Sequence, residues 1–141
     1  MPITLDIGGE GRHRRAWNLN RSRRKTLGAD RGDPIRNLIV GRGDAIPLAD
    51  KSVERIIVER TPLSAGVLRE MARVIAPHGT VVLRHVPLVG TDRHRLACEI
   101  LRGQTTCVLR RLGGALVQET TILVDDLSPG VECLVAAGSG S

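Results

Sequence analysis

Four polar side chains stand at the ends of apolar segments, where they could take part in chemistry. Asp6 lies in ITLDI, Asp44 follows NLIV, Glu59 ends ERIIVE, and His85 stands near the end of TVVLRHV. A carboxylate in such a position can act as a general base, and a histidine titrates close to neutral pH. Glu59 and His85 are therefore the candidate catalytic residues. The alternatives are a surface Glu59 paired with Arg60 and a purely structural His85.

The stretch GGEG follows the first apolar segment directly. A buried strand that runs into several glycines predicts a sharp turn, because glycine adopts backbone conformations that other residues avoid. Gly8, Gly9 and Gly11 keep this turn flexible and leave room for a close approach of another group.

The elements that must position these residues alternate between strands and helices. Apolar runs predict buried strands at residues 3–7, 37–40, 54–59 and 80–86. Thr61 and Pro62 have the chemistry of a helix cap and first helical residue, and the stretch from Pro77 to Gly79 ends that helix. A second helix is expected over residues 92–102. TCVLRRL and ALVQETTILV, joined by two glycines, predict an antiparallel hairpin.

The polar stretch over residues 12–36 is harder to assign. A helix over residues 14–24 would have only Ala16, Trp17 and Leu19 as apolar residues, too few to hold it on a sheet. The sequence therefore favours a strand over residues 16–20, followed by a loop.

This pattern predicts an α/β fold, a Rossmann-like, mostly parallel sheet flanked by helices on both faces, with a C-terminal antiparallel hairpin at one edge. Residues 1–126 are expected to form one domain, and residues 127–141 a tail. In such sheets ligands bind beyond the carboxyl ends of the strands. The glycine turn and the polar turn after NLIV are expected to meet there.

Composition narrows the function classes. The net charge is +6 and the pI about 10.5, which suggests nucleic acid, but aromatic residues make up only 1% of the chain. Because readers of single-stranded RNA stack bases on aromatic rings, nucleic acid is the weaker expectation. The three cysteines are odd in number and widely spaced, so no metal site is expected. No segment has the length of a membrane span or the pattern of a signal peptide, which favours a cytoplasmic protein without membrane contact.

Residues 12–36 are the most basic part of the chain, since nine basic residues there stand against only Asp30 and Asp33. The sequence favours a solvated, mobile surface. The alternative is a lid or docking patch for an anionic substrate, a carrier protein or RNA.

Three blocks of the sequence resemble class I S-adenosylmethionine-dependent methyltransferases. Within that family they resemble the small members similar to methyltransferase type 11. LDIGGEG resembles their first glycine motif. VGRGDAIPLADKSVERIIVE resembles their middle segment, and LREMARVIAPHGTVVLRHV resembles their helix, turn and next strand. The blocks occur in the family's order and together cover roughly residues 3–86. The resemblance implies S-adenosylmethionine as the cofactor. The chain departs from the family in its small size, so its first crossover helix is expected to be short or missing.

The resemblance also assigns roles to individual residues. Asp6 would receive the cofactor's amino group beside Gly8, Gly9 and Gly11. Asp44 would accept from the adenine amine, and the backbone N–H of Ala45 would meet a ring nitrogen. Glu59 would face the methyl donor. In each case the alternative is an ordinary turn or surface residue.

The sequence departs from the family at two places. Glu10 and Arg12 replace the second and third glycines of the first motif. The acidic residue that binds the ribose is replaced by Asn18 or Asn20, and only if TLGAD were the second strand would Asp30 take that role. An amide oxygen still accepts a hydrogen bond, but without the added strength that charge gives.

The expected function is an S-adenosylmethionine-dependent methyltransferase acting on a small molecule. Because the chain is barely longer than a cofactor-binding core, a second copy or a partner chain is expected to complete the pocket. The alternatives are a non-catalytic binding or assembly protein with this fold, and an RNA methyltransferase that uses the basic segment.

Overall fold

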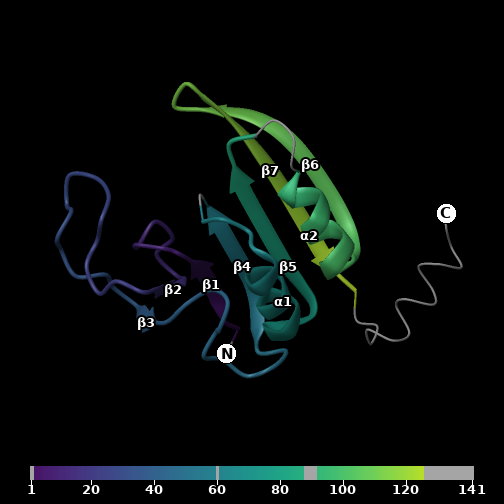
Figure 1. Cartoon of the computed structure of the whole chain (residues 1–141), viewed down its shortest axis with the longest axis horizontal. Helices are drawn as coiled ribbons and strands as arrows, with labels where there is room; N and C mark the ends of the chain where they lie inside the picture. Colours follow the sequence, from purple (N-terminus) through teal and green to yellow (C-terminus); the bar gives the residue numbers. More distant parts are fainter. Residues whose placement is uncertain (1, 60, 88–91, 126–141) are drawn as a thin grey trace, which may run out of the picture.

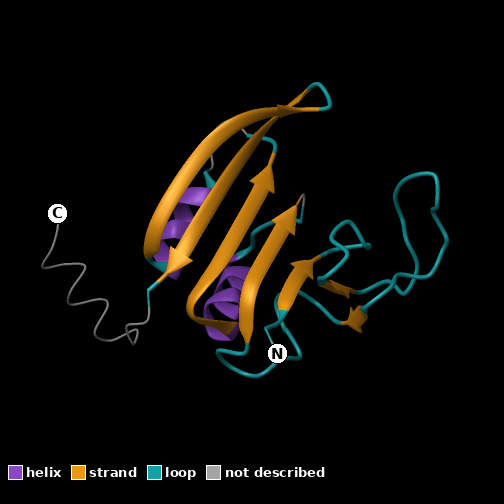
Figure 2. Ribbon diagram, turned by 180° about the vertical axis from the view of Figure 1, so that it is seen from behind, coloured by secondary structure: helices purple, strands orange, loops and turns teal. Residues whose placement is uncertain are grey.

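The described part of the protein is a single twisted sheet with two helices packed on it (Figures 1 and 2). The computed structural model describes residues 2–59, 61–87 and 92–125, so the expected tail lies outside the described residues. The strands are β1 (Thr4–Ile7), β2 (Trp17–Asn20), β3 (Leu38–Val40), β4 (Val53–Glu59), β5 (Ile75–His85), β6 (Gly103–Leu112) and β7 (Ala115–Val124), and the helices are α1 (Ala65–Val74) and α2 (Arg93–Leu101).

The strands lie in the order β3-β2-β1-β4-β5-β7-β6. The first five are parallel, and β7 pairs antiparallel with both β5 and β6. This confirms the mostly parallel sheet with a C-terminal hairpin. The chain order reverses between β1 and β4, which is the place where sheets of this kind bind ligands beyond the strand ends.

Both described helices lie on the same face of the sheet, as the two opposite views show (Figures 1 and 2). Side chains from this face of β1, β4, β5 and β7 form the core with α1 and α2, and Leu5, Ile56, Leu68, Met71 and Leu83 are fully buried in it. The expectation of helices on both faces is wrong for the described residues. The connections from β1 to β2 and from β2 to β3 contain too few apolar residues to form a packing helix, and they are loops.

The face without helices carries paired charges beside apolar residues, among them Ile57, Val82 and Val108. Arg84 on β5 bonds to Glu59 on β4 and Glu119 on β7, each at 2.7 Å, and Arg110 on β6 lies 3.5 Å from Glu119. These residues, together with Arg12 and Asp6, form a row of alternating charges across the sheet, here called the charge ladder.

Several predicted boundaries shift. The first helix begins after Ser64, whose hydroxyl accepts from the Val67 N–H, so Thr61 is not its cap. The expected turn at Pro77–Gly79 is an irregularity within β5, where His78 has a φ of +63°. The second helix is capped by Asp92, close to the predicted start. TLGAD forms no strand, so the alternative that placed Asp30 at the end of the second strand is wrong.

Among the described residues, no helix is long and apolar enough to cross a membrane.

Candidate functional site

The turns after β1 and β3 meet at one edge of the sheet, beside the start of α1. The Gly8 N–H donates to the Leu19 carbonyl at 2.7 Å, which ties the glycine turn to β2. A Cβ atom on Gly43 would lie 3.2 Å from the Ile7 side chain, and one on Gly66 would lie 3.1 Å from the Cβ of Asp44. Gly8 and Asp44 are therefore brought to the same edge, as the spacing of the strands predicts.

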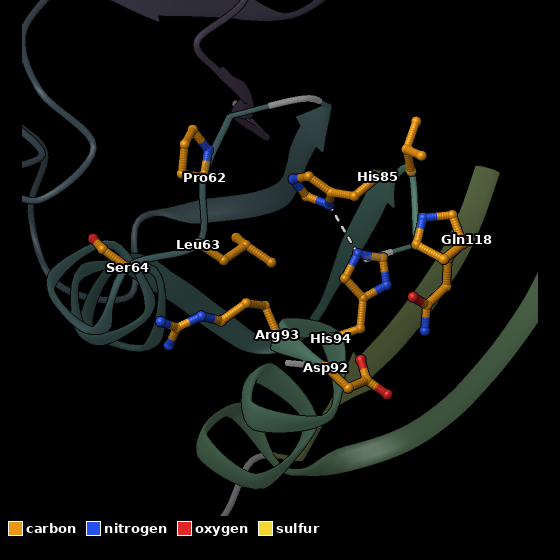
Figure 3. Close-up of a pocket in the computed structure, with 10 residues that line it drawn as sticks. Pro62, Leu63, Ser64, His85, Asp92, Arg93, His94 and Gln118 are labelled. Carbon is orange, nitrogen blue, oxygen red and sulfur yellow. Dashed lines mark hydrogen bonds between the residues drawn. The ribbon is translucent and has the colours of Figure 1, made fainter. Parts of the chain in front are cut away.

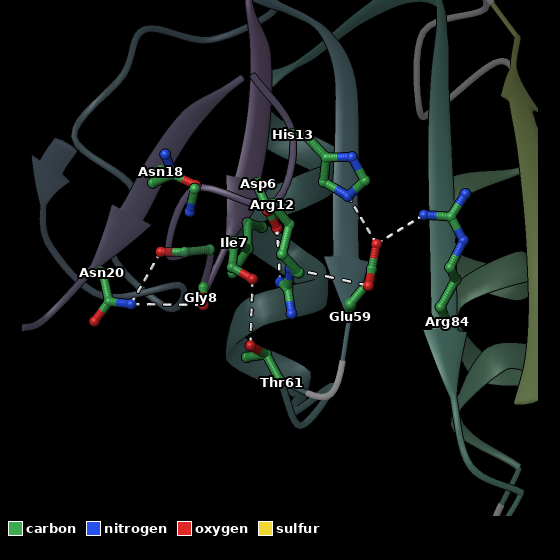
Figure 4. A network of polar contacts seen from close by, with 12 residues as sticks. Asp6, Ile7, Gly8, Arg12, His13, Asn18, Asn20, Glu59, Thr61 and Arg84 are labelled. Atoms are coloured by element: carbon green, nitrogen blue, oxygen red, sulfur yellow. Dashed lines mark hydrogen bonds and ion pairs between the residues drawn. The ribbon is translucent and has the colours of Figure 1, made fainter. Parts of the chain in front are cut away.

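Asp6 is a fully buried carboxylate under the glycine turn (Figure 4). Its Oδ1 accepts from the Arg12 guanidinium at 3.2 Å, whereas its Oδ2 has no hydrogen-bond partner among the described residues. Burial raises the pKa of Asp6, and the charge of Arg12 opposes that rise. A buried acceptor without a donor is costly, so Oδ2 is a position where an ordered water or a ligand N–H would stabilise the protein.

Asn18 and Asn20 shape the glycine turn from below. The Asn18 amide accepts from the Gly11 N–H at 3.1 Å and donates to the Arg36 carbonyl at 2.9 Å. Asn20 donates to the Gly9 carbonyl at 3.1 Å and accepts from the Ser22 N–H. Both amides thus bond within the chain, and the glycine turn is folded back onto β2.

Asp44 and Ala45 stand at the opposite side of the same edge. The Asp44 carboxylate is paired with Arg42 at 3.0 Å, and both side chains are exposed. The Ala45 N–H donates to the Arg42 carbonyl at 3.1 Å. An exposed ion pair contributes at most about 1 kcal/mol, so a ligand could replace Arg42 at Asp44 with little loss.

Glu59 lies on the open face of the sheet as the centre of the charge ladder (Figure 4). Its carboxylate is 2.7 Å from both His13 Nε2 and the Arg84 guanidinium, and 3.9 Å from Arg12 Nε. Burial alone would raise the pKa of Glu59, but the hydrogen bonds from His13 and Arg84 outweigh burial and lower it. A carboxylate held ionised by three basic neighbours is a weak proton acceptor.

A pocket of about 710 Å³ opens beyond the ends of β4 and β5, between the first turns of the two helices (Figure 3). Its wall combines apolar and polar groups, among them Leu63, Ser64, His85, Arg93, His94 and Gln118. The volume is that of a typical small-molecule site. Of the two predicted catalytic residues, His85 lines this pocket and Glu59 does not.

The two histidines in the pocket wall belong to one hydrogen-bonded chain. His85 Nε2 lies 2.7 Å from the Thr61 carbonyl, which can only accept, so this nitrogen carries the proton. In neutral His85, Nδ1 then accepts from His94 Nε2 at 2.8 Å, and His94 Nδ1 accepts from the Thr120 hydroxyl at 2.7 Å. Burial lowers the pKa of both rings, that of His94 to about 4.

Thr61 connects the glycine turn to the pocket. Its hydroxyl donates to the Ile7 carbonyl at 3.2 Å, and a Cβ atom on Gly8 would collide with that hydroxyl. Its own carbonyl receives the hydrogen bond from His85. Sequence reasoning assigned Thr61 to a helix cap and gave neither His94 nor Thr120 a role. Only the placement of His94 two residues after the Asp92 cap could have signalled that its ring lies near the pocket.

No protein-family model matches the sequence, and no curated protein is significantly similar to it in sequence. Solved structures are similar in fold. An S-adenosylmethionine-dependent methyltransferase from Thermotoga maritima, described as a possible histamine N-methyltransferase, is 13% identical with a TM-score of 0.63, over 89% of this chain and 83% of that one. The antibiotic-resistance methyltransferase Kmr is 14% identical with a TM-score of 0.61, over 90% and 88% of the two chains.

A third structure, the 16S rRNA N2 G1207 methyltransferase of T. thermophilus in complex with AdoMet and guanosine, is 15% identical with a TM-score of 0.59. It matches 92% of this chain, which spans only 37% of that protein. At these identities the similarity establishes the fold. The chain has the Rossmann-like fold of class I S-adenosylmethionine-dependent methyltransferases, with the same mixed sheet and C-terminal hairpin.

Proposed function

We propose that the protein transfers a methyl group from S-adenosylmethionine to a small molecule bound in the pocket lined by His85 and His94. The observation that carries this proposal is the adjacency of two sites in a methyltransferase fold. The glycine turn and Asp44 meet at one edge of the sheet, and the pocket opens at the neighbouring strand ends, with Thr61 in contact with both. The structural neighbours include methyltransferases whose described substrates are a small molecule and rRNA.

The residues at this edge fit the cofactor in part. Asp6 has a buried oxygen that needs a donor, and Asp44 is an exposed carboxylate that can accept from an amine. We propose that these two carboxylates, with Gly8, Gly9, Gly11 and Ala45, hold S-adenosylmethionine, and that Asn18 and Asn20 support the turn from below. Thr61 packs closely against Gly8, and Asn20 bonds to the Gly9 carbonyl.

When bound, S-adenosylmethionine supplies a methyl group that is already activated as part of a sulfonium. The protein then contributes mainly position and exclusion of water. Of the proposed catalytic residues, His85 is better placed than Glu59 to take a proton from the acceptor, because its ring lies in the pocket wall. For this role, the hydrogen bond between His94 Nε2 and His85 Nδ1 would have to break, so that Nδ1 could accept the proton of the acceptor.

A second candidate is a non-catalytic binding or assembly protein that keeps the fold. It is favoured by the internal bonds of Asn18, Asn20 and the Ala45 N–H, which engage the groups that the resemblance assigns to the cofactor.

Isothermal titration with S-adenosylmethionine and S-adenosylhomocysteine tests the proposal. We expect saturable binding to the folded protein, and a loss of roughly 10- to 100-fold in affinity in Asp44→Ala, because one charged hydrogen bond contributes about 1.5–3 kcal/mol. Asp50→Ala is the matched control, since Asp50 is an exposed carboxylate paired with Arg73 away from the turn. No binding at millimolar ligand would exclude the methyltransferase. Equal effects of the two substitutions would show that Asp44 does not contact adenine.

A further inference from the structure

The net positive charge of the protein arises in one lobe, residues 12–36, which forms β2 and the loops before and after it. This segment holds eight arginines and Lys25 against two aspartates, a net charge of +7. The whole chain has a net charge of +6, so the remaining residues together carry −1. The charge is therefore a property of this lobe and not of the protein's general composition.

The charges of the lobe are available to a partner. All eight arginines are exposed. Of these only Arg12 forms an ion pair with a described residue, and Lys25 is paired with Asp30. Arginines that lack carboxylate neighbours create a field that attracts anions. Such an accumulation of like charge has no stabilising role within the fold, because like charges repel one another in the folded state.

Hydrogen bonds give the lobe a defined shape. The Glu10 carboxylate accepts from the Thr26 N–H, the Thr26 hydroxyl and the Leu27 N–H, which anchors the long loop to the glycine turn. Backbone bonds close the loop between Lys25 and Asp33 and between Arg23 and the buried Ile35, at 2.8 and 3.0 Å. Figure 1 shows this loop standing out at the edge of the sheet farthest from β6.

The chemistry of the lobe fits single-stranded nucleic acid best. Eight of its nine basic residues are arginines, whose planar guanidinium binds phosphate through two parallel hydrogen bonds. Trp17, the only aromatic residue of the chain, lies within the lobe and is 45% exposed. An exposed indole ring among arginines offers a surface on which an unpaired base can stack. An anionic membrane could also use both the charges and the ring, so the test below includes anionic vesicles.

We propose that the lobe of residues 12–36 binds single-stranded RNA, with its arginines on the phosphates and Trp17 stacked against a base. None of the residues that line the pocket belongs to the lobe, so RNA binding can be tested without methyl transfer. The low aromatic content of the chain is compatible with it, because one ring placed among phosphate-binding arginines is enough to stack one base.

The test uses the full chain and a fluorescently labelled 20-nucleotide single-stranded RNA, with binding followed by anisotropy at several salt concentrations. About five phosphate contacts predict a slope near −3.5 in a plot of log affinity against log salt, because single strands lose about 0.7 per contact. Affinity should then fall roughly a hundredfold between 50 and 200 mM salt. Intrinsic fluorescence reports on Trp17 alone, and RNA should quench it.

Two triple variants with the same net charge separate the lobe from general electrostatics. R21Q/R23Q/R31Q removes three exposed arginines of the lobe, and R69Q/R95Q/R111Q removes three exposed arginines elsewhere. We expect the lobe variant to lose at least tenfold in affinity and about 2 units of salt slope, and the control to lose less than threefold.

Three outcomes would overturn the proposal. These are no anisotropy change at 50 mM salt, an equal loss of affinity in both triple variants, and RNA binding that leaves Trp17 fluorescence unchanged. Equal Trp17 quenching by vesicles of anionic lipid, at matched phosphate, would point to a membrane surface and would also overturn it. None of these measurements requires S-adenosylmethionine, so their failure is distinct from failure of the proposed methyltransferase.

Discussion

His94 is a buried histidine whose hydrogen bonds depend on its being neutral. Its Nδ1 accepts from the Thr120 hydroxyl and its Nε2 donates to His85. Protonation would place a proton on Nδ1, opposite the Thr120 hydroxyl that already donates to it. It would also place a positive charge on a residue that is only 4% exposed. The hydrogen bonds and the burial therefore favour the same neutral tautomer.

This arrangement predicts a loss of stability in acid. Burial, and secondly His85, lower the pKa of His94 to about 4, whereas the unfolded chain has a value near 6.5. Between these values the unfolded state binds the proton more tightly, so stability is complete above about pH 6.5 and falls as the pH drops towards 4. The loss at most amounts to roughly 3 kcal/mol. Urea unfolding followed by circular dichroism at several pH values measures it.

The control for this prediction is His94→Gln, whose amide can still donate to His85 and accept from Thr120. Acidic residues titrate in both proteins, so the informative quantity is the difference between the two stability curves. The variant should lose less stability than the parent between pH 6.5 and 4. Parallel curves would mean that His94 is not the group that titrates.

The individual polar residues of the site were predictable, but their partners were not. Asp6, Asp44 and His85 follow from their positions at strand ends, because parallel strands end at one edge of a sheet. The pairing of His85 with His94 depends on how α2 packs beside β5, and local spacing in the sequence does not encode that packing. The same holds for Glu59, which the sequence placed correctly at a strand end but without its bonds to His13 and Arg84.

The central part of the charge ladder joins three strands, β4, β5 and β7, on the open face of the sheet. Arg84 is the central cation, since it bonds to Glu59 on β4 and to Glu119 on β7. All three side chains are at most a quarter exposed, so the pairs are partly removed from water. Removing one charge from such a group leaves the opposite charges without compensation, which costs more than breaking an exposed pair.

Arg84→Met should therefore destabilise the protein by about 2 kcal/mol at pH 7, because two partly buried carboxylates lose their shared cation. Arg95→Met is the matched control, since Arg95 and Glu99 form an exposed pair at 3.6 Å on α2, and its effect should stay below about 0.5 kcal/mol. Urea unfolding of both variants provides the comparison, and equal losses would show that the ladder adds nothing beyond surface pairing.

The elements themselves were predicted more reliably than their boundaries. Strand runs rich in valine and isoleucine, and the double-glycine turn of the hairpin, were found where expected. The start of α1 was missed because Thr61 and Ser64 are both good caps, and the tertiary bond of Thr61 to Ile7 decides between them. The prediction of helices on both faces of the sheet was wrong. Alternating strands and helices place helices on both faces only when every connection between strands can form a helix, and the connections before and after β2 cannot.

At the scale of the whole molecule, helices support one half of the sheet more than the other. The strands β4 and β5 pack under α1, and Ile56, Val58, Val81 and Leu83 have no exposed surface. At the other edge, β3 has three residues, of which Leu38 and Ile39 are half-buried and Val40 is exposed. Buried apolar contacts determine how much free energy is needed to open a segment locally. The two halves of the sheet should therefore open with different free energies.

Native-state hydrogen exchange followed by NMR measures this difference residue by residue. The amides of β4 and β5 that bond within the sheet should exchange only through global unfolding. Those of β3 should exchange through local opening, at least a hundredfold faster, because few apolar contacts hold them. The comparison is internal, since both groups of amides lie in parallel strands of one sheet. If β3 proved as protected as β4, a contact outside the described residues, such as a second copy on the open face, would have to support that edge.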